Sequence, residues 1–175
     1  MMRIKRLMTM LFLSVFVVSL PVLTAAEGAM SVKGFGPRLG YGVNPDQFLI
    51  GGQAIMGKMF KIARLAPSID AGFGDHATVV TFNADLQLNL FQPPGSNVKF
   101  YGLLGPTLAY IDPEAGDSDT EVGITIGGGI KMPMGSSNMY NLEARIGTGD
   151  IPDFKLMLGI YFGGASNKVT DKDKK

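Results

Sequence analysis

The sequence has no cysteine and only one histidine, His76, and these two shortages remove several classes of function. Without cysteine, no disulfide can form and no N-terminal cysteine can carry a lipid. One histidine without a thiolate does not supply the ligands of a zinc site. A catalytic histidine needs a nucleophile close by, yet the serine nearest to His76 in the sequence is Ser68. The sequence therefore predicts no enzyme, no metal and no cofactor.

Beyond its first 26 residues, the chain also lacks a long uncharged apolar run and an excess of charge of one sign. A membrane helix needs roughly eighteen or more apolar residues in a row, so none is predicted there. Thirteen basic and fifteen acidic residues give this part a net charge of about −2. That balance does not indicate a nucleic-acid partner. If this part lies in a membrane, it has to cross as a β-barrel.

The first 26 residues have the organisation of a secretory signal. Arg3, Lys5 and Arg6 precede an apolar run from Leu7 to Leu23, and Thr24-Ala25-Ala26 supplies small residues at its end. The alternative is an N-terminal membrane anchor, but Pro21 and the small residues that follow it favour cleavage. We expect a signal peptide at residues 1–26, cleaved near Ala26, and an exported mature chain. At the other end, residues 164–175 are charged and lack aromatic residues, which predicts a disordered tail.

Between these ends, the chain alternates between apolar and polar residues with a period of two. In the segment from Thr78 to Leu90, apolar residues stand at the even positions from Val80 onward and polar residues at the odd positions from Thr81 onward. A strand of about ten residues is long for a small soluble sheet and suits a tilted crossing of a bilayer. Turn residues such as Asn44-Pro45-Asp46 and Pro93-Pro94-Gly95-Ser96-Asn97 separate similar segments. We predict eight strands, at about 31–43, 47–56, 63–73, 78–91, 98–111, 121–133, 138–147 and 154–163.

Two architectures use such strands, and the polar face distinguishes them. A soluble barrel turns its apolar face inward, whereas a membrane barrel turns it toward lipid. Here the polar face is mostly glycine, threonine, asparagine and glutamine, with a few charges of both signs. Such residues suit a narrow, filled interior better than a surface in bulk water. We therefore predict that residues 27–163 form an all-β domain, an eight-stranded antiparallel up-and-down transmembrane β-barrel.

Charged residues on the polar face define the main candidate site. Three are basic and three acidic, and we predict that they form an interior salt-bridge network, with Asp85 or Glu143 paired to Arg38 or Arg145, because eight strands leave room only for side chains. The alternative is a conducting or binding site. The six residues are Arg38, Asp70, Asp85, Lys131, Glu143 and Arg145.

A second candidate is the acidic stretch from Asp112 to Glu121, which holds five carboxylates in ten residues. Calcium binds such oxygen-rich loops, but the spacing of these carboxylates does not match that of the calcium-binding loop of about twelve residues. A solvated surface loop is the simpler interpretation. Since both chain ends of a barrel with an even number of strands are periplasmic, this loop is expected outside the cell. It is also expected to be the longest of the external connections.

Aromatic residues near the strand ends predict two belts at the membrane interfaces. One belt is expected at Tyr41, Phe48, Phe73, Tyr110 and Phe154, and the other at Phe60, Phe91, Phe100, Tyr140 and Phe162.

With its signal sequence, alternating strands and last strand Phe154-Lys155-Leu156-Met157-Leu158-Gly159-Ile160-Tyr161-Phe162, the chain resembles the small eight-stranded outer-membrane barrels of Gram-negative bacteria. These are grouped as the outer-membrane protein β-barrel domain, and the chain resembles uncharacterised members. The resemblance implies contact with outer-membrane lipid and recognition of Leu158, Ile160 and Phe162 by the barrel-assembly machinery. Thirteen residues follow Phe162, which departs from a strictly C-terminal signal.

The function expected from these features is a structural or surface-interaction role in the cell envelope. Two alternatives stay open at this point. One is a narrow channel for ions or small apolar solutes, and the other is a soluble periplasmic barrel that binds a lipid inside. The sequence assigns neither an extracellular partner nor an oligomeric state.

Overall fold

The computed structural model describes residues 31–58, 60, 62–74, 77–148 and 151–163. The predicted signal peptide, the charged tail and His76 lie outside these residues. Within the described part of the chain, no helix is long and apolar enough to cross a membrane.

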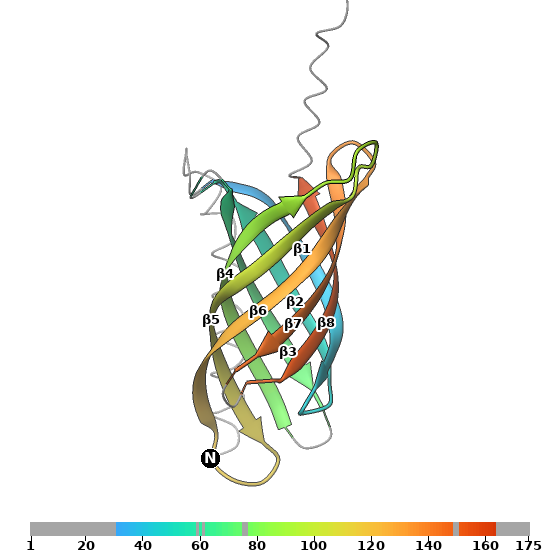
Figure 1. Cartoon of the computed structure of the whole chain (residues 1–175). Helices are drawn as coiled ribbons and strands as arrows, with labels where there is room; N and C mark the ends of the chain where they lie inside the picture. Colours follow the sequence, from blue (N-terminus) through green and yellow to red (C-terminus); the bar gives the residue numbers. More distant parts are fainter. Residues whose placement is uncertain (1–30, 59, 61, 75–76, 149–150, 164–175) are drawn as a thin grey trace, which may run out of the picture.

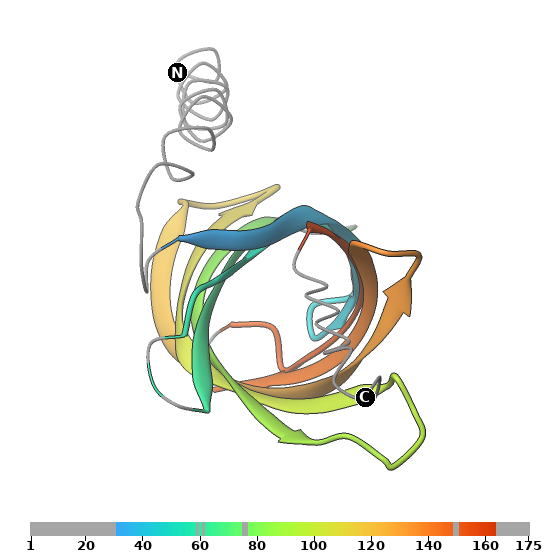
Figure 2. The ribbon, with the colours of Figure 1, turned by 90° about the horizontal axis from the view of Figure 1, so that it is seen from above.

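The described residues form a closed barrel in which each strand lies beside the next in the sequence (Figures 1 and 2). All neighbouring pairs are antiparallel, and β8 pairs with β1 to close the sheet. The predicted fold is thus confirmed, and every predicted strand boundary lies within two residues of the observed one. The strands are β1 (Val32–Val43), β2 (Gln47–Met56), β3 (Ala63–Phe73), β4 (Ala77–Phe91), β5 (Lys99–Pro113), β6 (Asp119–Met134), β7 (Asn138–Gly147) and β8 (Phe154–Gly163).

Burial in this barrel is the reverse of burial in a soluble protein. Large apolar side chains cover the outer wall, as at Phe48, Leu104 and Ile126, each about half exposed. Charged side chains such as Arg38 and Glu143 are buried in the interior. The period-two alternation of the sequence produces this arrangement, because successive side chains of a strand point to opposite faces.

Apolar side chains pack together inside the barrel near each of its two ends. We call the end where β1 begins and β8 ends, uppermost in Figure 1, the terminal rim, and the other end the opposite rim. Near the terminal rim, Ile55, Met139 and Tyr161 pack together. Near the opposite rim, Ile151 packs on Val79 and Ala109. Ile151 belongs to the β7–β8 connection and is buried.

The acidic stretch differs from its prediction in length. Pairing between β5 and β6 continues to Ile111 and Asp119, so the strands extend into the acidic segment and only residues 114–118 connect them. The β7–β8 connection, residues 148–153, is longer. The prediction that the acidic loop is the longest connection at this rim is therefore wrong, because the polar residues at its ends pair as strands.

Closure between β1 and β8 depends on a glycine and yields a testable prediction. A Cβ atom at Gly36 would overlap the carbonyl oxygen of Ile160 on β8, whereas a Cβ at Gly52 would meet only Ile69 Cγ2, at 4.0 Å. We expect Gly36→Ala to lower the free energy of unfolding by about 1–3 kcal/mol, as overpacking does. Gly52→Ala should change it by less than about 0.5 kcal/mol. Urea unfolding of the barrel refolded in lipid vesicles measures both, and equal midpoints would contradict the prediction.

Candidate functional site

The interior charges cross the lumen over glycines on the intervening strands. Gly51 of β2 pairs with Arg38 on one side and with Asp70 on the other. A Cβ at Gly51 would overlap Asp70 Oδ1. The missing side chain therefore leaves the space in which the arginine of β1 reaches the carboxylate of β3.

The pair of Arg38 and Asp70 has bidentate geometry. Arg38 Nε donates to Asp70 Oδ1 at 2.6 Å, and Arg38 Nη2 donates to Asp70 Oδ2 at 2.5 Å. Thr81 Oγ1 and Asn83 Nδ2 also donate to Asp70 Oδ2, both at 3.4 Å. Two parallel charge-assisted bonds fix both the distance and the plane of the guanidinium group. Asp70 is thus compensated in charge and supplied with hydrogen bonds.

Glu143 on β7 is the acid with the most partners. Arg145 donates to its Oε2 from Nε at 3.0 Å and from Nη2 at 2.8 Å. Arg38 Nη1 approaches the same oxygen at 3.5 Å. The other carboxylate oxygen, Oε1, accepts from Tyr101 OH at 2.8 Å and from Asn141 Nδ2 at 3.1 Å. Gly129 lies on β6 between Tyr101 and Glu143, where a side chain would collide with the tyrosine ring.

The ion pairs join into one chain of alternating charge. Arg145 Nη1 donates to Asp85 Oδ2 on β4 at 2.6 Å, in addition to its bonds with Glu143. The order across the lumen is therefore Asp70, Arg38, Glu143, Arg145 and Asp85. Each arginine lies between two carboxylates. Buried charges need such partners, because removal from water is costly.

Lys131 is predicted to belong to the interior network of ion pairs, but its ammonium group contacts an amide and two aromatic rings instead. Its Nζ donates to Gln87 Oε1 at 2.6 Å and lies 4.6 Å and 4.8 Å from the ring centres of Tyr161 and Tyr101. The reason is its place near the terminal rim, where its β7 neighbour is Asn141. The negative faces of the two rings and an amide oxygen stabilise the ammonium group instead of a carboxylate.

Lys155 is a member of the site that the prediction of six residues omits. Its Nζ donates to Thr81 Oγ1 at 2.9 Å and lies 4.0 Å from Asp70 Oδ2. The signal for it was present in the sequence, because Lys155 shares the parity of Tyr161, which also points inward.

An amide pair completes the interior. Gln53 Nε2 donates to Asn141 Oδ1 at 2.8 Å, and Asn141 Nδ2 donates to Gln53 Oε1 at 3.1 Å. The pair passes over Gly159, where a Cβ would overlap the Gln53 amide. The arrangement as a whole holds side chains in fixed positions across the lumen. Among the described residues, no group of three or more histidines, cysteines or acids has the geometry of a metal site.

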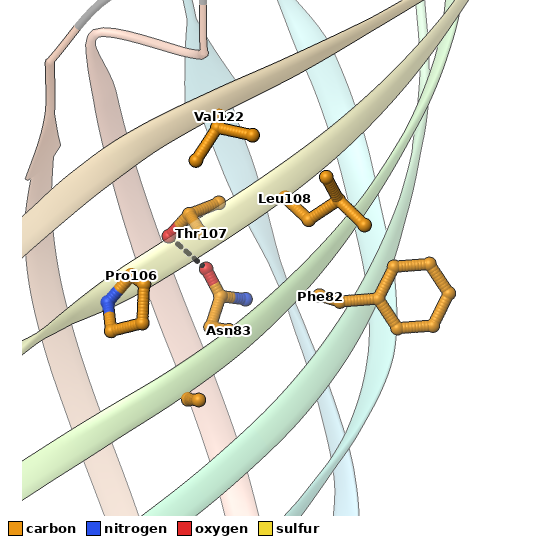
Figure 3. Close-up of a pocket in the computed structure, with 7 residues that line it drawn as sticks. Phe82, Asn83, Pro106, Thr107, Leu108 and Val122 are labelled. Carbon is orange, nitrogen blue, oxygen red and sulfur yellow. Dashed lines mark hydrogen bonds between the residues drawn. The ribbon is translucent and has the colours of Figure 1, made fainter.

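A hollow on the outer wall is separate from this interior (Figure 3). It lies over β4, β5 and β6, and its apolar lining includes Phe82, Leu108 and Val122. Behind it, Thr107 Oγ1 donates to Asn83 Oδ1 at 2.8 Å on the inner face of the wall. The hollow is open and apolar, so it offers no polar group to orient a ligand.

The residues expected to be read during assembly lie on the outer face of β8. Leu158 and Phe162 are each nearly half exposed, and Phe162 makes an edge-to-face contact with Phe35 of β1 at 6.4 Å between ring centres. Ile160 shares their parity and faces the same way.

The fold has counterparts among solved structures. The crystal structure of Neisserial surface protein A matches with a TM-score of 0.58 and 11% sequence identity, over 74% of this chain and 94% of that chain. The N-terminal β-barrel domain of Pseudomonas aeruginosa OprF matches with a TM-score of 0.55 and 16% identity, over 75% of this chain and 98% of that chain. No protein-family model and no curated protein matches the sequence.

These similarities define the class of the fold. The chain folds as a small eight-stranded β-barrel of the outer-membrane type. At this level of sequence identity, the resemblance concerns the fold alone.

The role of Glu143 in the interior can be tested by removing its charge. Glu143→Gln leaves Arg38 and Arg145 with one carboxylate each, and we expect the free energy of unfolding to fall by about 3 kcal/mol, as for a broken buried ion pair. The matched control is Glu114→Gln in the exposed β5–β6 connection, which should change it by less than about 0.5 kcal/mol. Urea unfolding in lipid vesicles gives both values. Equal stability of the two variants would show that the network does not stabilise the barrel.

Proposed function

We propose that this chain is an integral outer-membrane barrel with a closed interior and a structural or surface-interaction role in the cell envelope, without catalytic activity. The observation that carries the proposal is the outer wall. Leucine, isoleucine, valine and phenylalanine side chains are exposed around it, between aromatic residues at both rims. Such a wall would aggregate in water and is stable only when lipid covers it.

The closed interior favours this role over that of a channel. The charge network crosses the middle of the lumen, and the two apolar clusters lie beyond it at either end. An ion would have to displace paired charges and pass apolar side chains, in a barrel whose size leaves little more than side-chain space.

The distribution of polar residues also argues against the soluble lipid-binding barrel. A lipid inside such a barrel would need apolar lining along the lumen. Here the inward positions include Gln53, Asp70, Asn83, Gln87 and Thr107, all buried.

Export and assembly complete the proposal. The segment 1–26 would direct secretion and be cleaved near Ala26. Leu158, Ile160 and Phe162 would be read by the barrel-assembly machinery from the outer face of β8. The terminal rim would then face the periplasm, because both ends of the barrel domain lie there.

Cell fractionation and conductance test the proposal directly. We expect the full chain, expressed in a Gram-negative host, to appear in the detergent-extracted outer membrane as a band whose gel mobility changes on heating. Reconstituted in planar bilayers, it should give no reproducible conductance steps where a porin control does. Recovery in the soluble periplasmic fraction would overturn the membrane location, and steps that recur with a constant amplitude would favour the channel.

A further inference from the structure

In the part of the chain that the structure describes, exposed charges outside the barrel interior are segregated between the two rims. Among the described residues, the three exposed basic ones lie at the terminal rim, where there is no acid, and the seven acidic ones outside the interior lie at the opposite rim, where there is no exposed base. The basic residues are Lys33, Lys58 and Lys99, whereas Arg64 at the same rim has the inward parity of β3 and a buried Nε. The acidic residues are Asp46, Asp112, Glu114, Asp117, Asp119, Glu121 and Asp153.

Exposed apolar side chains accompany the basic residues of the terminal rim. In the β2–β3 connection, Phe60 is 60% exposed and Ile62 is 66% exposed, close to Lys58 in the sequence. The turn is held by reciprocal backbone hydrogen bonds between Phe60 and Ala63, at 3.2 and 3.3 Å. Exposed large apolar side chains are unfavourable in water, and their combination with neighbouring ammonium groups suits a membrane interface.

The same combination recurs elsewhere on this rim. Phe91 at the end of β4 stacks on Phe100 of β5 at 4.5 Å between ring centres, and Lys99 adjoins Phe100 in the sequence. On β1, Lys33 and Phe35 both point outward, and Lys33 lies two residues closer to the start of the strand at the terminal rim. Each unit combines an aromatic ring at the edge of the apolar wall with an exposed lysine close to it in the sequence, and Lys99 has the parity of the inward-facing Tyr101.

We propose that the terminal rim selectively binds the headgroups of anionic phospholipids in the leaflet that it faces. The inference rests on the membrane location proposed above. Aromatic rings favour the level of the headgroups, and lysine side chains can extend from there to the phosphates. Because no described acid at this rim neutralises the lysines, their attraction for a negative headgroup is retained.

The arrangement of the cations favours lipids over a small soluble anion. Lys33 and Lys58 lie near the paired ends of β1 and β2, where Gly57 N donates to Ser31 O, whereas Lys99 belongs to β5, three strands further round the ring. All three lysines therefore do not converge on one ion. Beneath them, the apolar cluster of Ile55, Met139 and Tyr161 fills part of the lumen and offers no group that would bind an anion. Separate headgroups in a ring around the barrel fit both observations.

The absence of tryptophan from the chain gives a direct test. In Phe60→Trp, the new indole is the only one and reports on lipids at the terminal rim. Phe48→Trp is the matched probe at the opposite rim. Each variant is refolded into phosphatidylcholine vesicles that contain either brominated phosphatidylglycerol or brominated phosphatidylcholine at the same mole fraction, and quenching gives a relative lipid-binding constant. Because both leaflets have the same composition, the direction of insertion does not affect the comparison.

We expect the relative binding constant for phosphatidylglycerol to be at least twofold at position 60 and about one or lower at position 48. High salt should reduce the preference, because it screens exposed charges. Adding Lys33→Gln, Lys58→Gln and Lys99→Gln to the position-60 probe should bring the constant to about one. The control set Asp112→Asn, Asp117→Asn and Asp119→Asn in the same background should leave it unchanged.

Several results would overturn the inference. The first is equal quenching by the two lipids at position 60, and the second is an equal preference at both rims. The third is a preference for phosphatidylglycerol that persists without the three lysines, in a protein that still shows the heat-modifiable band. Displacement by inorganic phosphate at constant ionic strength would instead identify a free-anion site. If neither lipid quenches and no heat-modifiable band forms, the membrane location itself is wrong, so the two failures are distinguishable.

Discussion

Every charge inside this barrel has to be compensated by the barrel itself, and that constraint governs the interior. An apolar outer wall leaves the polar side chains of each strand facing a lumen with little room for water. Arg38 and Arg145 meet the constraint because each contacts two carboxylates, with Glu143 shared between them. The shared acid ties β1, β3, β4 and β7 together across the lumen. Ion pairs here replace the apolar core of a soluble domain.

The glycines of the inward face make these crossings possible. A side chain that reaches a partner two strands away has to pass over the strand between them. Gly51 and Gly129 are placed under such crossings, of Arg38 to Asp70 and Tyr101 to Glu143. The pair of Gln53 and Asn141 spans two strands, and it passes over Gly159 of the second. The high glycine content of the chain therefore reflects packing of the interior as well as turns.

The fold was readable from the sequence because its signals are local. A period of two and the turn residues depend on neighbours in the chain, and they gave the strands and the inward positions of Asp70, Asp85 and Glu143. Pairing is not local, because it depends on the register and on the stagger of strands around the barrel. Parity alone therefore placed Lys131 inside without revealing that Tyr101 and Tyr161 would be its neighbours.

A barrel filled in this way has only its outer wall and its two rims with which to act. The wall is apolar, so it can distinguish little beyond lipid from water. Specificity has to come from the rims, and there the exposed charges of the described residues have opposite sign. The paired charges of the interior balance one another and give the barrel axis no preferred direction. The segregated charges of the rims, in contrast, make one end of the axis positive and the other negative. That polarity makes the two membrane surfaces inequivalent for this chain, even though the wall between them is apolar throughout.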